Sequence, residues 1–122
     1  MGMSTAVTSV VSQYATFSGR ARRSEFWWWY LAVFIVSAAF AGLAILWGSG
    51  TAGTLIRVGY ALFSLAILVP TIATATRRLH DRGMAAWWLA LFFIPVVGDI
   101  VLLVLLALPG DPGPNRYGAA PR

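Results

Sequence analysis

The sequence predicts an all-α integral membrane protein with three transmembrane helices, organised as a single membrane domain over residues 1–122. Three long apolar runs, at 26–47, 58–76 and 85–108, occupy most of the chain. At 1.5 Å per residue they would form helices roughly 33, 28 and 36 Å long, enough to cross a hydrocarbon core of about 30 Å. Hydrophobic residues make up 59% of the chain and charged residues only 11%, whereas soluble domains carry about 25% charged residues.

The composition argues against several classes of function. The net charge of +5 comes from nine arginines against four acidic residues, and such an excess beside membrane spans reflects orientation more often than nucleic-acid binding. With no cysteine and one histidine, the chain lacks the ligands of a thiolate or histidine metal cluster. No phosphate-loop, dinucleotide-binding or zinc-protease spacing occurs. We therefore predict a non-enzymatic protein with no cofactor, no metal and no nucleic-acid partner.

A short helix at residues 6–18 is predicted before the first span. Apolar and aromatic side chains recur there at intervals of three and four, as on one face of a helix: Val7, Val10, Val11, Tyr14 and Phe17. The pattern suits a helix that lies on the membrane surface. Because the apolar face is small, a helix packed against the other helices, or a frayed tail, fits equally well.

The ends of the first two spans carry an orientation signal. Residues 20–25 (RARRSE) directly precede the aromatic residues at 26–30 (FWWWY), which is typical of a membrane interface. A second basic cluster at 77–82 (RRLHDR) follows the second span. The positive-inside rule then predicts a cytoplasmic N-terminal side, with both clusters on that face and the glycine-rich turn at 48–53 on the other. Arg57 lies near that turn, where its long side chain can reach the lipid head groups.

The second basic cluster offers ion pairing but little chemistry. On a continuous helix Arg77 and Arg78 lie four and three residues before Asp81, so both can pair with this carboxylate. An acid–base pair of His80 and Asp81 is disfavoured, because adjacent helical side chains point about 100° apart and no nucleophile accompanies them. Within the span, Pro70 removes one backbone donor, and nearby threonines can return hydrogen bonds to the freed carbonyls.

The third apolar run is interrupted near its middle by residues 95–98 (PVVG). Two structures are compatible with this break. A single broken helix would span the membrane and leave the tail outside, whereas two half-helices would dip in and return. Length favours spanning, while the positive-inside rule mildly favours the hairpin, because Arg116 and Arg122 would then join the other arginines. We adopt the broken span, Ala85 to Leu108, as the prediction.

Asp99 is the candidate intramembrane site. An ionised aspartate near mid-membrane costs roughly 2.5 to 3.5 kcal/mol on insertion scales, so it requires a partner, water or a proton. The favoured interpretation is a carboxylate that caps the half-helix restarting after Gly98, where exposed backbone N–H groups are available. The alternative is a proton or ion site in an oligomeric transporter or channel.

The composition changes abruptly after Leu108. The last segment, residues 109–122, contains four prolines and three glycines, which exclude a helix and favour turns. A structured turn packed on the helices and a loose tail are both compatible with this composition.

Three segments together resemble a known family, the bacterial inner-membrane proteins grouped as domain of unknown function 805. The first segment contains Phe17, Gly19, Arg20, Ala21, Arg23, Glu25, Phe26 and Trp27. The second contains Arg77, Arg78, Leu79, His80, Asp81, Gly83, Trp87 and Trp88. The third contains Pro109, Gly110, Gly113, Asn115, Arg116, Tyr117, Gly118 and Pro121.

The resemblance covers roughly residues 11–121 and implies a small, multi-pass helical protein of the bacterial inner membrane, without implying a reaction or substrate. The chain departs from the family pattern at Ala85 and Ala86, where a Ser-Gly pair is common. It departs again at Asp99, where an apolar residue or proline is expected. The resemblance therefore implies no role for Asp99.

The leading functional hypothesis is a non-enzymatic inner-membrane protein whose polar cluster at the cytoplasmic interface binds anionic lipid or a partner protein. Its members are Arg20, Arg23, Glu25, Arg77, Arg78, His80 and Asp81. A cluster that only fixes topology and internal salt bridges is equally compatible. A second candidate motif is Asn115, Arg116 and Tyr117. The alternative function is a subunit of a small oligomeric transporter or channel that uses Asp99, with small residues such as Gly42 and Gly59 allowing close contacts in a homo-oligomer.

Overall fold

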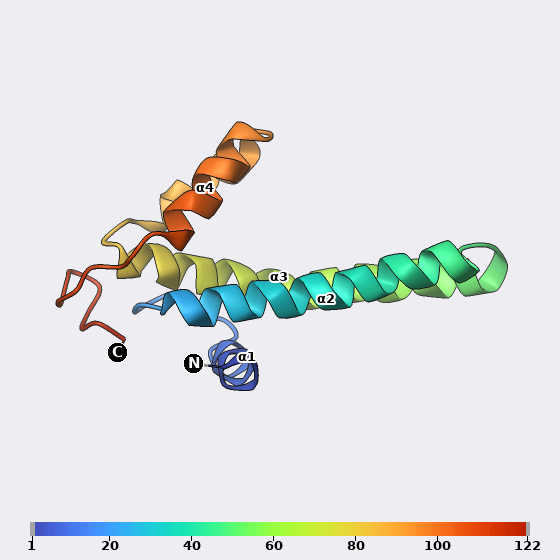
Figure 1. Cartoon of the computed structure of the whole chain (residues 1–122), viewed down its shortest axis with the longest axis horizontal. Helices are drawn as coiled ribbons and strands as arrows, with labels where there is room; N and C mark the ends of the chain where they lie inside the picture. The colour runs from blue at the N-terminus through green and yellow to red at the C-terminus, as the bar shows by residue number, and fades with distance from the viewer. Residues whose placement is uncertain (1, 122) are drawn as a thin grey trace.

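Two long antiparallel helices dominate the fold (Figure 1). The computed structural model describes residues 2–121 and contains no named strand in that range. Helix α2 spans Arg23–Trp47 and helix α3 spans Gly50–Asp81, and together they form what we call the long hairpin. Each is long and apolar enough to cross a membrane, and only 6% of its most apolar window is buried inside the chain. Such a surface is not that of a soluble core helix, because the apolar side chains have no protein to pack against.

Helix α3 is longer at both ends than the predicted span over 58–76. It begins at Gly50 and continues to Asp81, within the second basic cluster, and Gly83 with φ +75° follows two residues later. Pro70 stays inside this helix. Its missing N–H frees the carbonyl of Ala66, and the Tyr14 hydroxyl donates a hydrogen bond to that oxygen. Thr74 Oγ1 donates at 2.7 Å to the carbonyl of Pro70 itself, which is not the freed carbonyl, so the predicted hydrogen bond from a threonine to the freed carbonyl is not confirmed.

The third apolar run is not a continuous helix, so the predicted third spanning helix is not confirmed. A 3-10 helix, η1 (Ala86–Phe93), and an α-helix, α4 (Val97–Ala107), pack against each other as a short hairpin. Their eight and eleven residues reach only about 16 Å each, half of a hydrocarbon core. Of the two structures compatible with the sequence, the chain therefore has the hairpin.

The turn of the short hairpin explains why the run reverses. Val96 has φ +63° and ψ −64°, and the Val97 N–H donates to the Pro95 carbonyl at 2.7 Å, which defines a γ-turn. Gly98 then lies so close to the Leu91 carbonyl that a Cβ atom would overlap it. Gly98 thus permits close packing of α4 on η1, instead of merely interrupting one helix.

Helix α1 spans Met3–Ser12 and crosses the long hairpin at a steep angle, so that Figure 1 shows it nearly end-on. It begins and ends earlier than the predicted 6–18. Ala6 and Val10 are fully buried in contact with the long hairpin, whereas Val11 and Tyr14 remain exposed. Of the interpretations left open by the sequence, the structure has a helix packed against the other helices.

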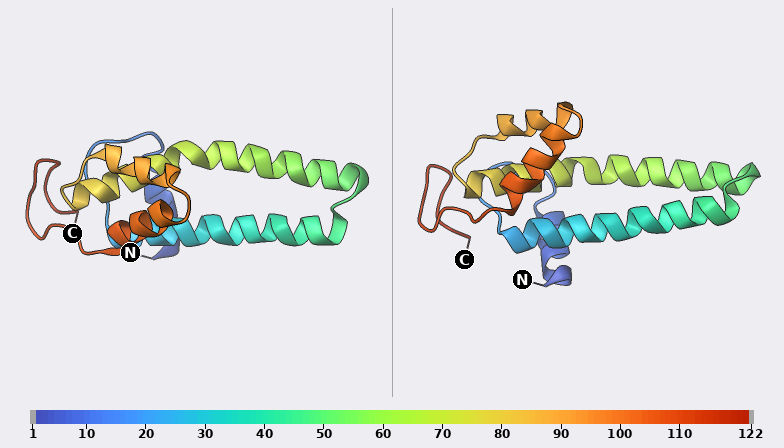
Figure 2. Two further views of the ribbon diagram at one scale, coloured as in Figure 1. Left: turned by 90° about the horizontal axis from the view of Figure 1, so that it is seen from above. Right: turned by 45° about the horizontal axis from the view of Figure 1, so that its top comes forward.

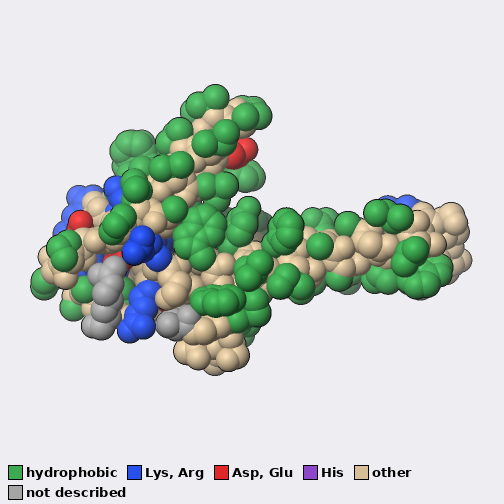
Figure 3. All heavy atoms as spheres, in the orientation of Figure 1, with side chains coloured by type: hydrophobic (Ala, Val, Ile, Leu, Met, Phe, Trp, Pro, Cys, Tyr) green, Lys and Arg blue, Asp and Glu red, His purple; other side chains and the backbone are tan. Residues whose placement is uncertain are grey.

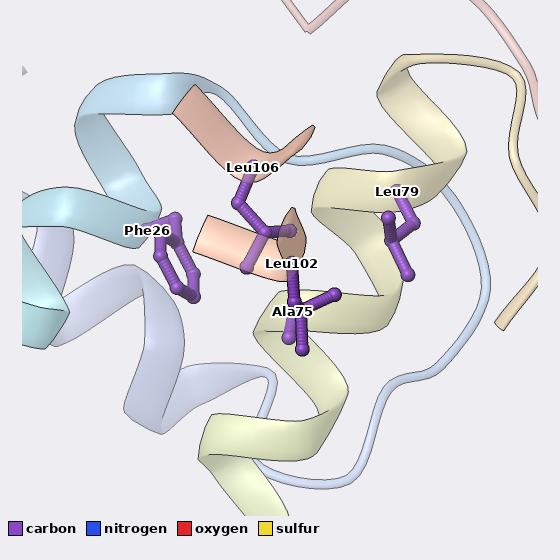
Figure 4. Packing of buried hydrophobic residues seen from close by; sticks show 5 residues of the cluster. All are labelled: Phe26, Ala75, Leu79, Leu102 and Leu106. Atoms are coloured by element: carbon purple, nitrogen blue, oxygen red, sulfur yellow. The ribbon is translucent and has the colours of Figure 1, made fainter. Parts of the chain in front are cut away.

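A small apolar cluster joins both hairpins where α2, α3 and α4 meet (Figure 4). Its buried members are Phe26, Ala75, Leu79, Leu102 and Leu106. The opposite end of the short hairpin has little contact with the rest of the chain, since the side chain of Phe93 is 82% exposed and that of Val96 is 67% exposed. The short hairpin is therefore anchored at its α4 C-terminal end and presents an apolar turn to its surroundings.

This architecture predicts which positions share a side of the membrane. Because the short hairpin returns the chain, cysteines introduced at Ser4 and Ala119 should react alike with a membrane-impermeant maleimide, and only after permeabilisation of cells. A cysteine at Ser49, between α2 and α3, should react in intact cells. The sequence has no native cysteine, so each variant carries a single thiol. Labelling of position 119 but not position 4 in intact cells would contradict the hairpin.

Candidate functional site

Three segments that are distant in the sequence meet at one end of the long hairpin, which we call the base. Figure 2 shows the C-terminal tail, residues 109–121, beside the start of α2 and the end of α3 in both views. Five charged side chains are buried there, each at most 8% exposed, and we call them the polar core: Arg20, Glu25, Arg77, Arg78 and Asp81. The sequence predicted a polar cluster of these residues at an interface, and the structure turns all five inward.

Asp81 pairs with two arginines at once. Its Oδ1 accepts a hydrogen bond from Arg20 Nε at 2.9 Å and lies 2.8 Å from Arg20 Nη2 in an ion pair, and its Oδ2 accepts from Arg78 Nη1 at 2.5 Å. All three side chains have at most 1% of their surface exposed. The predicted pairing of Arg78 with Asp81 across one helical turn is confirmed. Arg20 comes from the segment before α2, so Asp81 also ties that segment to α3.

The second ion pair of the polar core joins α3 to α2. Arg77 Nη1 lies 2.8 Å from Glu25 Oε1. The same guanidinium donates to the Thr16 carbonyl at 3.1 Å and to Thr74 Oγ1 at 3.2 Å. Arg77 therefore uses all three of its nitrogens, each toward a different segment of the chain.

Arginines of the polar core also hold the tail by its backbone. Arg20 donates to the carbonyls of Gly113 (2.7 Å), Gly118 (3.1 Å) and Asp111 (2.6 Å), and to that of Asp81 (3.2 Å). With its bond to the Asp81 carboxylate, all five N–H donors of Arg20 are used. A fully occupied guanidinium has no donor left for an external ligand.

Arg78 performs the same role for the end of α4. Its Nε donates to the Leu106 carbonyl at 3.0 Å, and its Nη2 donates to the Leu108 carbonyl. The last carbonyls of a helix lack partners within the helix and carry partial negative charge, so a buried cation satisfies both needs.

The motif Asn115, Arg116 and Tyr117 folds as a tight turn on the end of α3. Asn115 Nδ2 donates to the His80 carbonyl (2.9 Å) and to Asp111 Oδ2 (2.8 Å), and the Tyr117 N–H donates to Asn115 Oδ1 (2.8 Å). The Tyr117 ring stacks on the His80 ring, with centroids 3.8 Å apart and planes 3° from parallel. The two groups of residues that the sequence analysis treated separately therefore lie in contact with each other.

His80 also contacts the segment before α2. Its Nδ1 lies 2.9 Å from the Gly19 carbonyl, where an Nδ1–H group donates. Gly110 completes the close approach, because a Cβ atom there would overlap the Asp81 carboxylate. His80 and Gly110 thus bring the tail and the segment before α2 into contact with the last turn of α3.

Four further arginines of the base are not buried in the polar core, and we call them the arginine rim: Arg23 and Arg116, which are exposed, and Arg22 and Arg82, which are half-buried. Three of them donate one hydrogen bond each, to the carbonyls of Pro121, Ala107 and Pro109. Arg116 lies over the Tyr117 ring at 4.9 Å. The sequence grouped Arg23 with the inward residues and did not single out Arg22 or Arg82, because charge clusters by themselves do not distinguish inward from outward arginines.

Asp99 lies apart from the polar core, in the first turn of α4. The interpretation of Asp99 as a helix cap is wrong: the N-cap residue is Val96, and no side chain caps this helix. The reason is that the γ-turn starts α4 at Val97, which places Asp99 inside the first turn. Its Oδ1 is buried without a hydrogen-bond partner among residues 2–121. Within the same range no group of three potential metal-ligating side chains occurs.

Taken together, the fold and the polar core define a small helical membrane protein that uses buried arginines to dock its own C-terminal tail. The chain belongs to the family described as "Protein of unknown function (DUF805)", whose model matches residues 14–119. The resemblance drawn from the sequence is thereby confirmed. Most residues of the three segments that carried it lie at the base, whereas Trp87 and Trp88 belong to η1.

Curated relatives place this family in the inner membrane. The chain is 40% identical to "Inner membrane protein YhaI" of Escherichia coli K12, over 93% of this chain and 92% of the relative. It is 34% identical to "Inner membrane protein YhaH" of the same strain, over 93% of each, and 30% identical to "Uncharacterized protein YiiR", over 84% of each. None of these names describes an enzyme. No solved structure gives a significant match.

The polar core predicts a large effect of Asp81→Asn. Removing this charge leaves Arg20 and Arg78 buried without their carboxylate, which costs roughly 3–5 kcal/mol. The unfolding midpoint of the purified protein in detergent, followed by tryptophan fluorescence, should fall steeply. Asp99→Asn is the matched control, because the Asp99 carboxylate has no ion pair in the described chain. Equal midpoints for the two variants would contradict the assigned role of Asp81.

The docked tail predicts a contrast between two glycines. Gly110→Ala places a methyl group on the Asp81 carboxylate, whereas a Cβ at Gly113 meets nothing within 4 Å. The Gly110→Ala variant should therefore release the tail, measured as faster cleavage of the tail by limited proteolysis in detergent micelles. Gly113→Ala should be cleaved at the wild-type rate. The same rate for both variants would show that the tail is not held through Gly110.

Proposed function

We propose that this chain is a non-enzymatic inner-membrane protein that binds anionic phospholipid head groups at its base. The binding surface is the arginine rim, and the base faces the cytoplasm. The partition of the arginines supports the proposal, since three are buried within the polar core while the four of the rim are exposed or half-buried beside apolar helices. Three arginines and two carboxylates in the polar core also leave one buried positive charge in excess.

The arginine rim has the chemistry that phosphate recognition requires. Arg22 and Arg82 donate one hydrogen bond each to the tail, and Arg23 donates one to the last residue of α4, which leaves most of the five donors of each guanidinium without a hydrogen bond in the described chain. Figure 3 shows on one face that arginines gather at the base while hydrophobic side chains cover both hairpins. Basic groups beside inserted apolar segments attract the anionic cytoplasmic leaflet with about 1 kcal/mol per residue.

The buried residues support this surface without binding lipid themselves. The polar core fixes the start of α2, the end of α3 and the tail, and each of these segments carries one or two rim arginines. The leading hypothesis from the sequence is therefore kept in an altered form: lipid binding is assigned to the rim, and the internal salt bridges are assigned to the polar core.

The test compares lipid selectivity in reconstituted vesicles. Spin-labelled phosphatidylglycerol should be enriched beside the wild-type protein relative to spin-labelled phosphatidylcholine. Arg23→Gln combined with Arg116→Gln removes about 2 kcal/mol of attraction and should abolish most of this selectivity, as should about 1 M salt, which shortens the screening length to about 3 Å. Both residues are exposed, so the double variant should keep the wild-type unfolding midpoint. Unchanged selectivity in a folded double variant would refute the proposal.

A further inference from the structure

A groove lies between the two long helices, toward the end opposite the base. It has a volume of about 420 Å³ and is lined by Phe40, Ala41 and Ala44 of α2 and by Ile56, Arg57 and Tyr60 of α3, among others. The volume falls in the range of about 300–1,000 Å³ that is usual for small-molecule sites. The alanines leave the space open, and most of the lining is apolar. The groove opens on a surface whose solvent is lipid, because both helices are of spanning length.

The wall of the groove is well defined. The Phe40 ring packs over Gly59, where an added Cβ atom would lie 3.2 Å from the ring. It also packs against Tyr60 and Phe63, with ring centroids 5.6 and 5.8 Å apart. These aromatic contacts hold α2 and α3 together at the wall of the groove, so the open space is part of the packing of the two helices.

Arg57 gives the groove one positive charge. It is exposed and takes part in none of the ion pairs of the described chain. It lies seven residues, or about 10 Å, from the start of α3. Side chains point toward the N-terminus of their own helix, which here is the outer end of α3, so the guanidinium extends toward the membrane surface.

The described chain supplies no anionic partner for Arg57. Acidic residues of the described range are Glu25, Asp81, Asp99 and Asp111, which lie at the base or in the short hairpin. A second copy inserted with the same orientation brings no acid to this level either, and a twofold contact through the groove would place two Arg57 side chains near each other. The anion present at this depth in a bilayer is the phosphate of a phospholipid.

We propose that the groove binds one phospholipid, with its phosphodiester on Arg57 and one acyl chain against Ala41, Ala44 and Phe40. This site is on the opposite side of the membrane from the arginine rim and does not depend on the lipid selectivity proposed for the base. A single cation recognises the phosphate that all phospholipids share, so zwitterionic and anionic lipids both bind.

The test is a lipid titration of the full-length protein in detergent, followed by native mass spectrometry. Phosphatidylcholine is the probe, because its zwitterionic head group excludes the anionic selectivity of the base, and diacylglycerol with the same acyl chains lacks the phosphate. The wild-type protein should retain one phosphatidylcholine and bind diacylglycerol at least tenfold more weakly. Arg57→Gln should weaken phosphatidylcholine about tenfold or more, as loss of a charged hydrogen bond predicts, while Arg57→Lys stays within about threefold.

A second pair of variants tests the acyl-chain part of the site. Ala44→Leu fills the groove and should weaken phosphatidylcholine and diacylglycerol alike by about tenfold. Ala39→Leu makes the same change at an exposed position of α2 outside the groove lining and should bind as the wild type does. Wild-type lipid retention by Arg57→Gln or by Ala44→Leu overturns the proposal. A dimer that Ala44→Leu dissociates without loss of lipid also overturns it, because the groove would then be an interface between copies.

Discussion

The two ion pairs of Asp81 are the constraint on which the base depends. Its carboxylate neutralises Arg20 and Arg78, and these arginines in turn hold the backbone of the tail and the end of α4. A buried carboxylate shared by two guanidiniums is stable only when all the groups around it are also satisfied. Carbonyl oxygens of the tail accept three further hydrogen bonds of Arg20. This explains why a segment rich in proline and glycine is ordered against the helices.

The long hairpin was predictable from the sequence because hydrophobicity and charge along α2 and α3 are local properties. The short hairpin was one of two structures that the sequence left open, and it was not the one adopted, because the length argument assumed that the helix continues through Pro95. What decides the reversal is the contact of Gly98 with the Leu91 carbonyl and the γ-turn at Val96. Both depend on how two helices pack on each other, which the hydrophobic pattern of the run does not encode.

The members of the polar core were predictable as a group, but their roles were not. Helical spacing gives the pair Arg78–Asp81, since it needs only one turn of α3. It does not reveal that Glu25 supplies the ion pair of Arg77, or that Arg20 reaches a carbonyl 98 residues away at Gly118. Contacts between distant segments also separate the buried arginines from those of the rim, which a count of charges treats as equal.

The short hairpin gives the molecule an unequal cross-section along the membrane normal. At the level of Trp47 and Gly50 only α2 and α3 are present, whereas α1, η1 and α4 all lie toward the base (Figure 1). With the long hairpin across the membrane and the base at one face, as we propose, one leaflet accommodates a wider body than the other. A wedge of this shape displaces more lipid area on one side, so membrane curvature changes the free energy of the protein, and its lateral distribution becomes sensitive to where the membrane bends.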